Sequence, residues 1–393
     1  MSLRRYFSGL SANTFLLALG SFCADISTEM LYPVLPIFLT QTLEANASIV
    51  GLVEGIAQAT QNIVQGLSGQ ISDKLKRRKP IATIGYAIAA VAKPLIGLSP
   101  AWPFVLGARS LDRLGTGIRS APRDALVAAS ADEAHRGKAF GLEGFGDNLG
   151  AFLGPLIAIA LIALWRVNVR SIFLIAFIPG LLAMLTVLFV RENPITVTAK
   201  SKLDLSFCRF PKKYWTYISV TALFGIGNSS NSFLILRTTD LGASLTVTIF
   251  IYSLFNLLAA LASYPAGYLS DKFGRKAILL LAFLVFLVVY TGFGLTTSTA
   301  LIGILFVLYG IFQGIFRSVG KALAADLVPS ELHASGVGWY TATIGITGLG
   351  ANIAGGTLWM KVSPSATFFF GAGSALLGSI ALVVFILQAE KTR

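Results

Sequence analysis

Residues 69–78 read GQISDKLKRR, and residues 267–276 read GYLSDKFGRK. Each segment combines a glycine, a Ser-Asp-Lys core and closing cations, and the second follows the first by 198 positions in a chain of 393 residues. The same displacement relates a further set of positions: Arg119 to Arg317, Ser120 to Ser318, Arg123 to Lys321, Glu133 to Glu331 and His135 to His333. Duplication at half the chain length predicts two repeated halves, an arrangement found in many membrane transporters.

The composition excludes most soluble classes of protein. Charged residues make up 12% of the chain, against about 25% in soluble proteins, whereas apolar residues reach 55% and the mean hydropathy is +0.75. A soluble domain cannot hide so much apolar surface, so we expect a helical membrane protein with many spans. The two cysteines, Cys23 and Cys208, lie in an apolar run and in a basic linker, which argues against a disulfide or a cysteine metal site.

Twelve apolar runs are long enough to cross a bilayer core, which needs about 20 residues per helix. We expect spans over residues 12–39, 48–72, 80–99, 103–125, 138–163, 171–190, 214–236, 245–270, 277–296, 300–322, 336–359 and 366–388. The first run is not a cleavable signal peptide, because it is too long and carries Asp25 and Glu29. The chain is thus predicted to divide into an N-terminal half at 1–190, a cytoplasmic linker at 191–213 and a C-terminal half at 214–393.

The formal net charge of +13 is distributed unevenly between the two sides of the predicted bundle. With the N-terminus in the cytoplasm, most cations fall on the cytoplasmic side, including Arg119, Arg123 and the runs 74–79 and 191–213. The opposite side holds Arg166, Arg170, Arg237 and Lys361. This positive-inside bias predicts that both termini are cytoplasmic. The basic excess is a topology signal, so we expect the lipid bilayer and not nucleic acid as its partner.

Three sequence signatures carry a family resemblance. The pattern G-x-x-x-D-[RK]-x-G-[RK]-[RK] is matched by Gly69, Asp73, Lys74, Arg77 and Arg78, with Lys76 in place of the second glycine, and completely by Gly267, Asp271, Lys272, Gly274, Arg275 and Lys276. The pattern R-x-x-x-G-x-G is matched more weakly by Arg109 and Gly115. The pattern G-x8-G-x3-G-P is met by Gly141, Gly150, Gly154 and Pro155, with Ala158 and Ile159 in place of a final glycine pair.

On these signatures the chain resembles the major facilitator superfamily over essentially its whole length. The resemblance implies an all-α integral membrane fold, with twelve transmembrane helices in two pseudo-symmetric six-helix halves. It also implies a secondary transporter and not an enzyme. In that superfamily the third signature accompanies proton-driven exporters, so it favours efflux.

The physical roles of the signatures can be argued separately. The carboxylates of Asp73 and Asp271 can meet the positive N-terminal end of a neighbouring helix, and the adjacent cations can pair with acidic helix ends such as Asp124. The doubled loop is therefore interpreted as a conformational latch on the cytoplasmic side, the alternative being that its cations only orient the protein. The third signature lies in the fifth predicted span, 138–163, and is called the helix-5 signature below. Its glycines permit close helix packing and Pro155 favours a bend, so packing alone is the alternative role.

Away from the cytoplasmic loops, the charges within the predicted spans are concentrated in the N-terminal half. They are Asp25, Glu29, Glu54, Lys93, Arg109, Asp112, Arg113, Glu143 and Asp147. A displacement of 198 residues leads from each of them to an uncharged residue, so the scaffold is duplicated while the charge chemistry is not. A charge at bilayer depth costs on the order of 3 kcal/mol. We therefore expect these groups to serve the solute or the coupling ion.

We assign proton coupling and solute binding to these groups as follows. Proton coupling is expected of Asp25, Glu29, Glu54, Asp112 and Asp147, and solute binding of Lys93, Arg109 and Arg113. Asp25 and Glu29 share a helix face, as do Arg109 and Arg113, and in the resembled fold the two pairs meet in one cavity. Two carboxylates in a low dielectric resist being ionised together, which suits one of them to carry a proton, whereas a nearby arginine opposes this. The alternative is a permanently paired salt-bridge network.

The seventh predicted span, residues 214–236, is expected to form a broken helix, called helix 7 here. Residues 225–233 read GIGNSSNSF, a polar, glycine-containing stretch at mid-depth, and broken helices line binding sites in transporters. Asn228 and Asn231 are candidate solute ligands. Gln313, in the predicted span 300–322, is a weaker candidate. The alternative is that these polar groups pack between helices.

The predicted function is a secondary transporter that moves a small organic solute across the inner membrane by alternating access, as a monomer, with efflux coupled to protons. One alternative is proton- or anion-coupled uptake of a sugar, organic acid or metal-chelate. The other is a membrane enzyme or a sensor, against which stands the lack of a soluble domain and of a catalytic or metal-ligand cluster. No cofactor and no metal is expected, and the nucleotide pattern G-x-x-x-x-G-K-[ST] is missing from the sequence.

Overall fold

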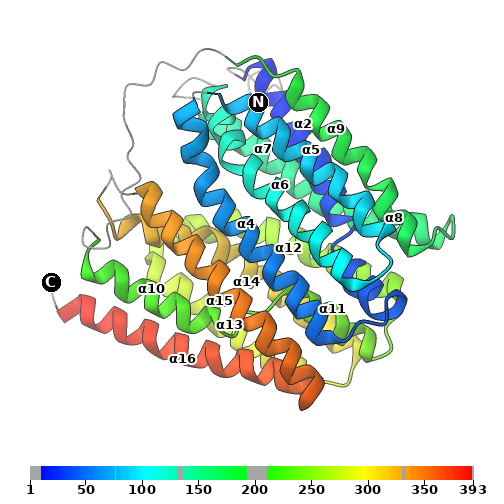
Figure 1. The fold of residues 1–393 in the computed structure, drawn as a ribbon. Coiled ribbons are helices and arrows are strands. Elements are labelled where there is room, and N and C mark those ends of the chain that lie inside the picture. Colours follow the sequence, from blue (N-terminus) through cyan, green and yellow to red (C-terminus); the bar gives the residue numbers. More distant parts are fainter. Residues whose placement is uncertain (1–9, 76, 131–135, 193–209, 330–332, 392–393) are drawn as a thin grey trace, which may run out of the picture. The chain divides into compact units, whose positions relative to one another are not determined.

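A computed structural model describes the chain except for residues 1–9, 76, 131–135, 193–209, 330–332 and 392–393 (Figure 1). The described residues form long helices joined by short turns. Their bounds are α2 (Ala12–Glu29), α3 (Leu35–Ile37), the π-helix η1 (Phe38–Thr42), α4 (Ala47–Leu75), α5 (Arg78–Leu98), α6 (Trp102–Ala129), α7 (Arg136–Ala163), α8 (Val169–Ile175), α9 (Phe177–Leu188), α10 (Lys212–Gly225), α11 (Asn231–Asp240), α12 (Leu245–Phe273), α13 (Arg275–Leu295), α14 (Thr299–Asp326), α15 (His333–Lys361) and α16 (Pro364–Lys391).

Seven stretches of the described residues are long and apolar enough to cross a membrane. They are Arg78–Leu98, Leu142–Ala163, Val169–Leu188, Leu245–Ser263, Arg275–Leu295, Thr299–Asp326 and Pro364–Gln388. The remaining predicted spans fall on helices that carry charges, such as α6, or on a helix pair with a break, α10 and α11. The all-helical membrane class is thus confirmed, whereas a count of twelve spans stays a prediction.

The chain forms two compact units. Unit 1 comprises Met1–Leu35 and Thr60–Ser201, and unit 2 comprises Pro36–Ala59 and Lys202–Arg393. Helix α4 contributes to both units, since its first half belongs to unit 2 and its second half to unit 1. The predicted division at 1–190, 191–213 and 214–393 stays a prediction.

In unit 1, helices α5 and α6 run side by side and touch through their backbones (Figure 1). A Cβ atom on Gly115 would lie 2.6 Å from the backbone nitrogen of Ala89, and one on Gly85 would lie 2.7 Å from the carbonyl oxygen of Gly115. Only glycine permits this approach, because a side chain at either position would separate the helices. The residues that follow each glycine are therefore held in fixed positions against the neighbouring helix.

Unit 2 has an aromatic core. Phe224 of α10 stacks on Phe283 of α13 with ring centroids 4.0 Å apart, and Phe286 stacks on Tyr290 at 3.9 Å. Phe312 of α14 packs edge-on against Phe286 at 4.9 Å. Each such ring buries a large apolar area and stacked pairs add to it. Aromatic side chains from α10, α13 and α14 thus pack together in the core of this unit.

Candidate functional site

Helix α6 carries a row of charged residues along one face. Arg109, Asp112, Arg113, Arg119 and Arg123 follow one another at spacings that place them on the same side of a helix. The first four are buried, and the side chain of Arg123 is 16% exposed. Arg119 and Arg123, which the sequence analysis counts among the cytoplasmic cations, are thus largely buried residues of this helix, and the side of the membrane on which they lie stays a prediction. Because α6 continues to Ala129, both side chains lie within unit 1.

Asp112 is the centre of an inner cluster that we define as Lys93, Arg109, Asp112 and Arg113. The Oδ1 atom of Asp112 accepts a hydrogen bond from Lys93 Nζ at 3.0 Å, and its Oδ2 atom accepts one from Arg109 Nη1 at 2.9 Å. Arg113 Nε lies 3.7 Å from the same Oδ2 atom. The Asp112 side chain is fully buried. One carboxylate thus serves as counter-ion to three cations, since buried charges require partners.

Two further contacts fix the arginines of the inner cluster. Arg113 Nη1 donates a hydrogen bond to Gln61 Oε1 at 3.2 Å. The guanidinium of Arg109 lies over the ring of Tyr32 at 5.7 Å from its centroid. The predicted solute ligands Lys93, Arg109 and Arg113 are therefore brought together, and they share one counter-ion.

A second cluster surrounds Arg123 and is defined by Ser21, Arg123, Asp124, Glu143 and Asp147. Arg123 lies 2.9 Å from Asp124, 3.0 Å from Glu143 and 3.7 Å from Asp147. Ser21 links the cluster to α2, because its hydroxyl donates to Glu143 at 2.6 Å and accepts from Arg123 at 3.1 Å. The predicted proton-coupling residue Asp147 thus shares its cation with two other carboxylates.

The helix-5 signature falls on α7, where it packs against α2. A Cβ on Gly150 would lie 2.5 Å from the carbonyl oxygen of Phe22 and 3.0 Å from the Cβ of Asp25. A Cβ on Gly154 would lie 3.1 Å from the Cβ of Glu29. These glycines therefore place the backbone of α7 directly against the part of α2 that carries both carboxylates. Pro155 lies within the same helix, while the side chain of Gly141 is outside the described residues.

Asp25 interacts electrostatically with four charged residues, namely Asp147, Arg119, Glu29 and Arg123. Arg119 and Arg123 lie on the charged face of α6, further along it than Arg109 and Arg113. That the α2 carboxylates face Arg109 and Arg113 stays a prediction. Among the described residues, no hydrogen bond or ion pair holds the partly buried Asp25 carboxylate, which is therefore available to take up a proton.

The polar residues of the helix-7 stretch anchor a break between α10 and α11, as the sequence predicts. The Ser229 hydroxyl lies 3.2 Å from that of Tyr290, and the Ser230 backbone N–H donates to Asn352 Oδ1 at 2.6 Å. The predicted solute ligand Asn231 accepts a hydrogen bond from the Tyr309 hydroxyl at 3.0 Å. Asn231 is thus engaged in packing.

Three other predicted site residues also lie in unit 2. Asn228 and Gln313 are partly buried, and no hydrogen bond of either side chain is present among the described residues. They remain candidates for a solute contact. Glu54 is buried on the first half of α4, so it belongs to a different unit from the other four predicted proton-coupling residues.

Part of the predicted latch can be located. For five of the latch residues the surroundings fall outside what the structure describes. These are Gly69, Asp73, Lys74, Gly267 and Asp271. Lys272 and Arg77 are exposed, as is Gly274, which has a φ of +90° and caps α12. Arg275 Nε lies 2.6 Å from Asp326 at the end of α14, which is the predicted type of contact between a loop cation and an acidic helix end.

Glu192 is a loop contact that the sequence analysis missed. Its carboxylate accepts hydrogen bonds from the backbone N–H groups of Arg78 at 2.6 Å and Lys79 at 3.1 Å. A carboxylate at this place caps the N-terminus of α5, where the helix leaves its first N–H groups unpaired. Since Glu192 lies within the predicted basic linker, its charge alone carried no signal for this role.

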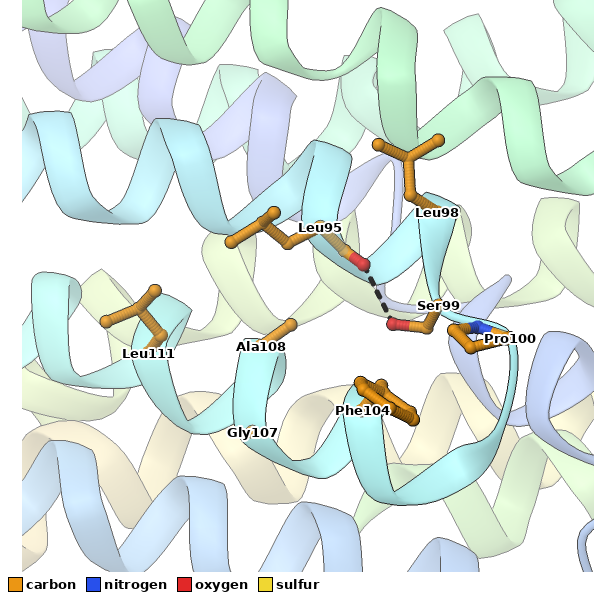
Figure 2. Close-up of a pocket in the computed structure, with 8 residues that line it drawn as sticks. All are labelled: Leu95, Leu98, Ser99, Pro100, Phe104, Gly107, Ala108 and Leu111. Carbon is orange, nitrogen blue, oxygen red and sulfur yellow. Dashed lines mark hydrogen bonds between the residues drawn. The ribbon is translucent and has the colours of Figure 1, made fainter.

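Two surface hollows lie away from the charged face. The first, between the end of α5 and the start of α6, is lined by apolar side chains and by Ser99, whose hydroxyl donates to the Leu95 carbonyl at 2.8 Å (Figure 2). Leu98 and Phe104 at its rim are more than 60% exposed, as expected for a surface that faces lipid. The second, in unit 2, includes Asp240, whose pKa burial raises while Arg237 opposes the shift. Neither hollow contains a charged cluster.

Comparison with known proteins places the chain in one family. The profile of the Major Facilitator Superfamily matches residues 17–236 and 216–393. An MFS-type transporter of Methanocaldococcus jannaschii is 35% identical over 383 residues, covering 96% of this chain and 95% of the relative. A multidrug resistance protein of Klebsiella pneumoniae is 26% identical over 311 residues, covering 75% of this chain and 74% of the relative.

Solved structures agree on the fold. A nucleoside transporter superposes with a TM-score of 0.80 at 14% identity, covering 95% of this chain and 99% of that one. A POT family transporter has the same TM-score and identity, with 97% and 96% covered. The profile match and the M. jannaschii relative show that the chain is a membrane-spanning transporter and not an enzyme, and that it belongs to the Major Facilitator Superfamily.

Proposed function

We propose that the chain is a proton-coupled exporter of a small organic solute. In this proposal it has twelve transmembrane helices in two halves, works as a monomer in the inner membrane with both termini in the cytoplasm, and exposes its solute site to each side in turn. The observation that carries the proposal is the Asp25 carboxylate on α2, which lies against α7 with no hydrogen bond or ion pair among the described residues.

Asp25 is assigned the proton because the other described carboxylates of unit 1 are engaged. Asp112 is held by three cations, and Glu143 is bonded to Ser21 and Arg123. A proton carrier must exchange its proton with water and must sense the charges around it. Asp25 meets both requirements, since it is partly exposed and lies near Glu29 and Asp147 as well as near Arg119.

Glu29 is assigned a supporting role in proton coupling. It lies one turn from Asp25 on the face of α2 that Gly154 brings against α7. A second carboxylate at this distance makes full ionisation of the pair unfavourable, so a single proton is retained more readily. The solute is assigned to the inner cluster of unit 1. Asn228 and Gln313, in unit 2, stay separate candidates for a solute contact. Glu54 stays a candidate for proton coupling from unit 2.

Efflux is favoured over uptake by two observations. The helix-5 signature is present at Gly150, Gly154 and Pro155 and forms the packing surface for the α2 carboxylates. A multi-drug resistance efflux pump homolog of Lactococcus lactis is 24% identical over 332 residues, covering 81% of each chain. The M. jannaschii relative and the structural neighbours are transporters of other or unstated direction, so direction rests on these two observations.

The proposal is tested by solute-evoked proton flux. Purified protein is reconstituted into liposomes that contain a pH-sensitive dye, and carboxylates, phosphate esters, nucleosides, amines and apolar dyes are added in turn. At least one class is expected to evoke a proton flux in the wild type, which Asp25→Asn abolishes. Glu44→Gln, at an exposed residue that follows η1, is the matched control and retains the flux. A wild type that transports a solute without any proton flux would overturn the coupling.

A further inference from the structure

Arg119 is a buried cation that the proposed coupling does not use. It is 5% exposed, and its Nε and Nη1 atoms are buried without a hydrogen-bond acceptor among the described residues. No carboxylate of the described part of the chain lies within ion-pair distance of it. Buried charges in proteins are normally paired or bind a ligand, so a guanidinium in this state is suited to bind an anionic group.

The position of Arg119 is built into the contact between α5 and α6. A Cβ on Gly85 would lie 2.7 Å from the backbone nitrogen of Arg119 and 2.8 Å from its Cβ, so the base of the side chain is clamped by the neighbouring helix. The guanidinium then lies over the ring of Tyr86, 4.4 Å from its centroid. Stacking on a ring engages the face of the guanidinium and leaves its N–H groups free to donate at the edges.

The charges around Arg119 favour an anionic ligand. Arg119 and Arg113 both act electrostatically on Lys93 as neighbouring cations. Arg119 also acts on the carboxylate of Asp25. The inner cluster on one side of it holds three cations and one carboxylate. Asp25 of α2 interacts electrostatically with it, and Arg123 follows it on α6. The inner cluster therefore carries a net positive charge, which favours an anionic ligand at Arg119 over a neutral or cationic one.

The repeat shows that the fold does not require a buried arginine here. Arg317 is the residue displaced by 198 from Arg119, and it is exposed on α14. The same helix position in the second half therefore folds with its guanidinium in contact with solvent. Burial and the aromatic partner are specific to Arg119, because the position equivalent to Tyr86 is Leu284.

We infer that the transported solute carries an oxyanion, a carboxylate or a phosphate group, and that Arg119 binds it. The inference rests on the proposed transport of a small organic solute and adds its chemical class. Arginine suits both groups, since its planar N–H donors match the oxygens of either one. In this arrangement the oxyanion and the ionised Asp25 carboxylate compete for the same cation.

The test is equilibrium binding of four probes of similar shape to the purified full chain by calorimetry. The probes are benzoate, phenyl phosphate, neutral benzamide and cationic benzamidine. One or both anions should bind, with benzamide and benzamidine at least about tenfold weaker, because loss of a charged hydrogen bond changes affinity about ten- to hundredfold. Binding of benzoate alone identifies a carboxylate solute, and binding of phenyl phosphate alone identifies a phosphate.

Variants then assign the binding to Arg119. Arg119→Gln should weaken the bound anion about ten- to hundredfold, Arg119→Lys should weaken it less, and Asp25→Asn should tighten it by removing the competing carboxylate. Arg317→Gln is the matched control and should leave affinity unchanged. If Arg119→Gln does not give a monodisperse protein, Arg119→Lys and Asp25→Asn provide the comparison. Absence of anion binding, unchanged affinity in the Arg119 variants, or tighter binding of benzamidine would overturn the inference.

Failure of this inference is distinguishable from failure of the proposed function. A proton flux evoked only by amines would support proton-coupled transport while overturning the assignment of an oxyanion. Binding of anions through Arg119 without any solute-evoked proton flux would support the oxyanion site while overturning proton coupling.

Discussion

Replacement of Asp112 by asparagine is expected to destabilise unit 1 strongly. The substitution preserves the shape of the side chain but removes the counter-ion that lies 3.0 Å from Lys93, 2.9 Å from Arg109 and 3.7 Å from Arg113. Removing one partner from a fully buried ion pair costs about 3–5 kcal/mol, because a charge is left in a medium that cannot solvate it. Asp112→Asn should therefore lower the free energy of unfolding by about that amount.

The same helix supplies the control. Asp124 also pairs with an arginine at 2.9 Å, but its side chain is 46% exposed. Exposed ion pairs contribute about 0–1 kcal/mol, so Asp124→Asn should change the free energy of unfolding by no more than this. Both variants can be compared in mixed micelles by circular dichroism during titration with sodium dodecyl sulfate.

A double variant sharpens the test. Lys93→Met removes one of the cations that Asp112→Asn leaves without its counter-ion, so the two losses should not add. A coupling free energy of about 0.5–3 kcal/mol is typical of residues in one buried network. Equal losses for Asp112→Asn and Asp124→Asn, together with additive effects of Lys93→Met, would refute the placement of Asp112 at the centre of the inner cluster.

Two further substitutions test the packing and the loop. Gly150→Ala should destabilise the protein by about 1–3 kcal/mol, because the added Cβ would press on α2. Gly144→Ala on the same helix has open space around the added Cβ and should stabilise the protein slightly. Thermal unfolding of both variants checks this, and equal midpoints would contradict the close packing. Arg275→Gln should cost about 0–1 kcal/mol, since its pair with Asp326 is partly exposed; a loss as large as that of Asp112→Asn in the same titration would show that this pair is more than a surface contact.

The sequence predicts the class of the fold and the composition of the site better than its geometry. The repeat at 198 residues, the apolar runs and the break near Asn228 are local patterns, and the helices reflect them. The concentration of charge in the N-terminal half is also visible in the sequence, because a comparison of positions 198 residues apart is enough to reveal it.

The partners of each charge could not be read from the sequence. The i, i+4 spacing shows that Asp25 and Glu29 share a face, but it does not fix the rotation of α2 against α6. Gly150 and Gly154 of α7 admit the backbone of α2, and this packing leaves Asp25 in electrostatic interaction with Arg119.

The sequence analysis places Arg119 among the cytoplasmic cations, although its position falls within the predicted span 103–125. The structure buries it because Gly85 and Gly115 bring α5 close enough for Tyr86 to cover it. The spacing of Arg119 from Asp112, two helical turns along one face, was the signal that could have identified it.

The most direct test of proton coupling through Asp25 compares two transport modes in one variant. In proteoliposomes, a solute identified by the flux screen can be accumulated against its gradient by an imposed pH difference, or exchanged at equilibrium between the two sides. Asp25→Asn is predicted to abolish accumulation driven by the pH difference while retaining exchange, because the solute site persists without the proton carrier. Accumulation by Asp25→Asn at the wild-type level would contradict the account.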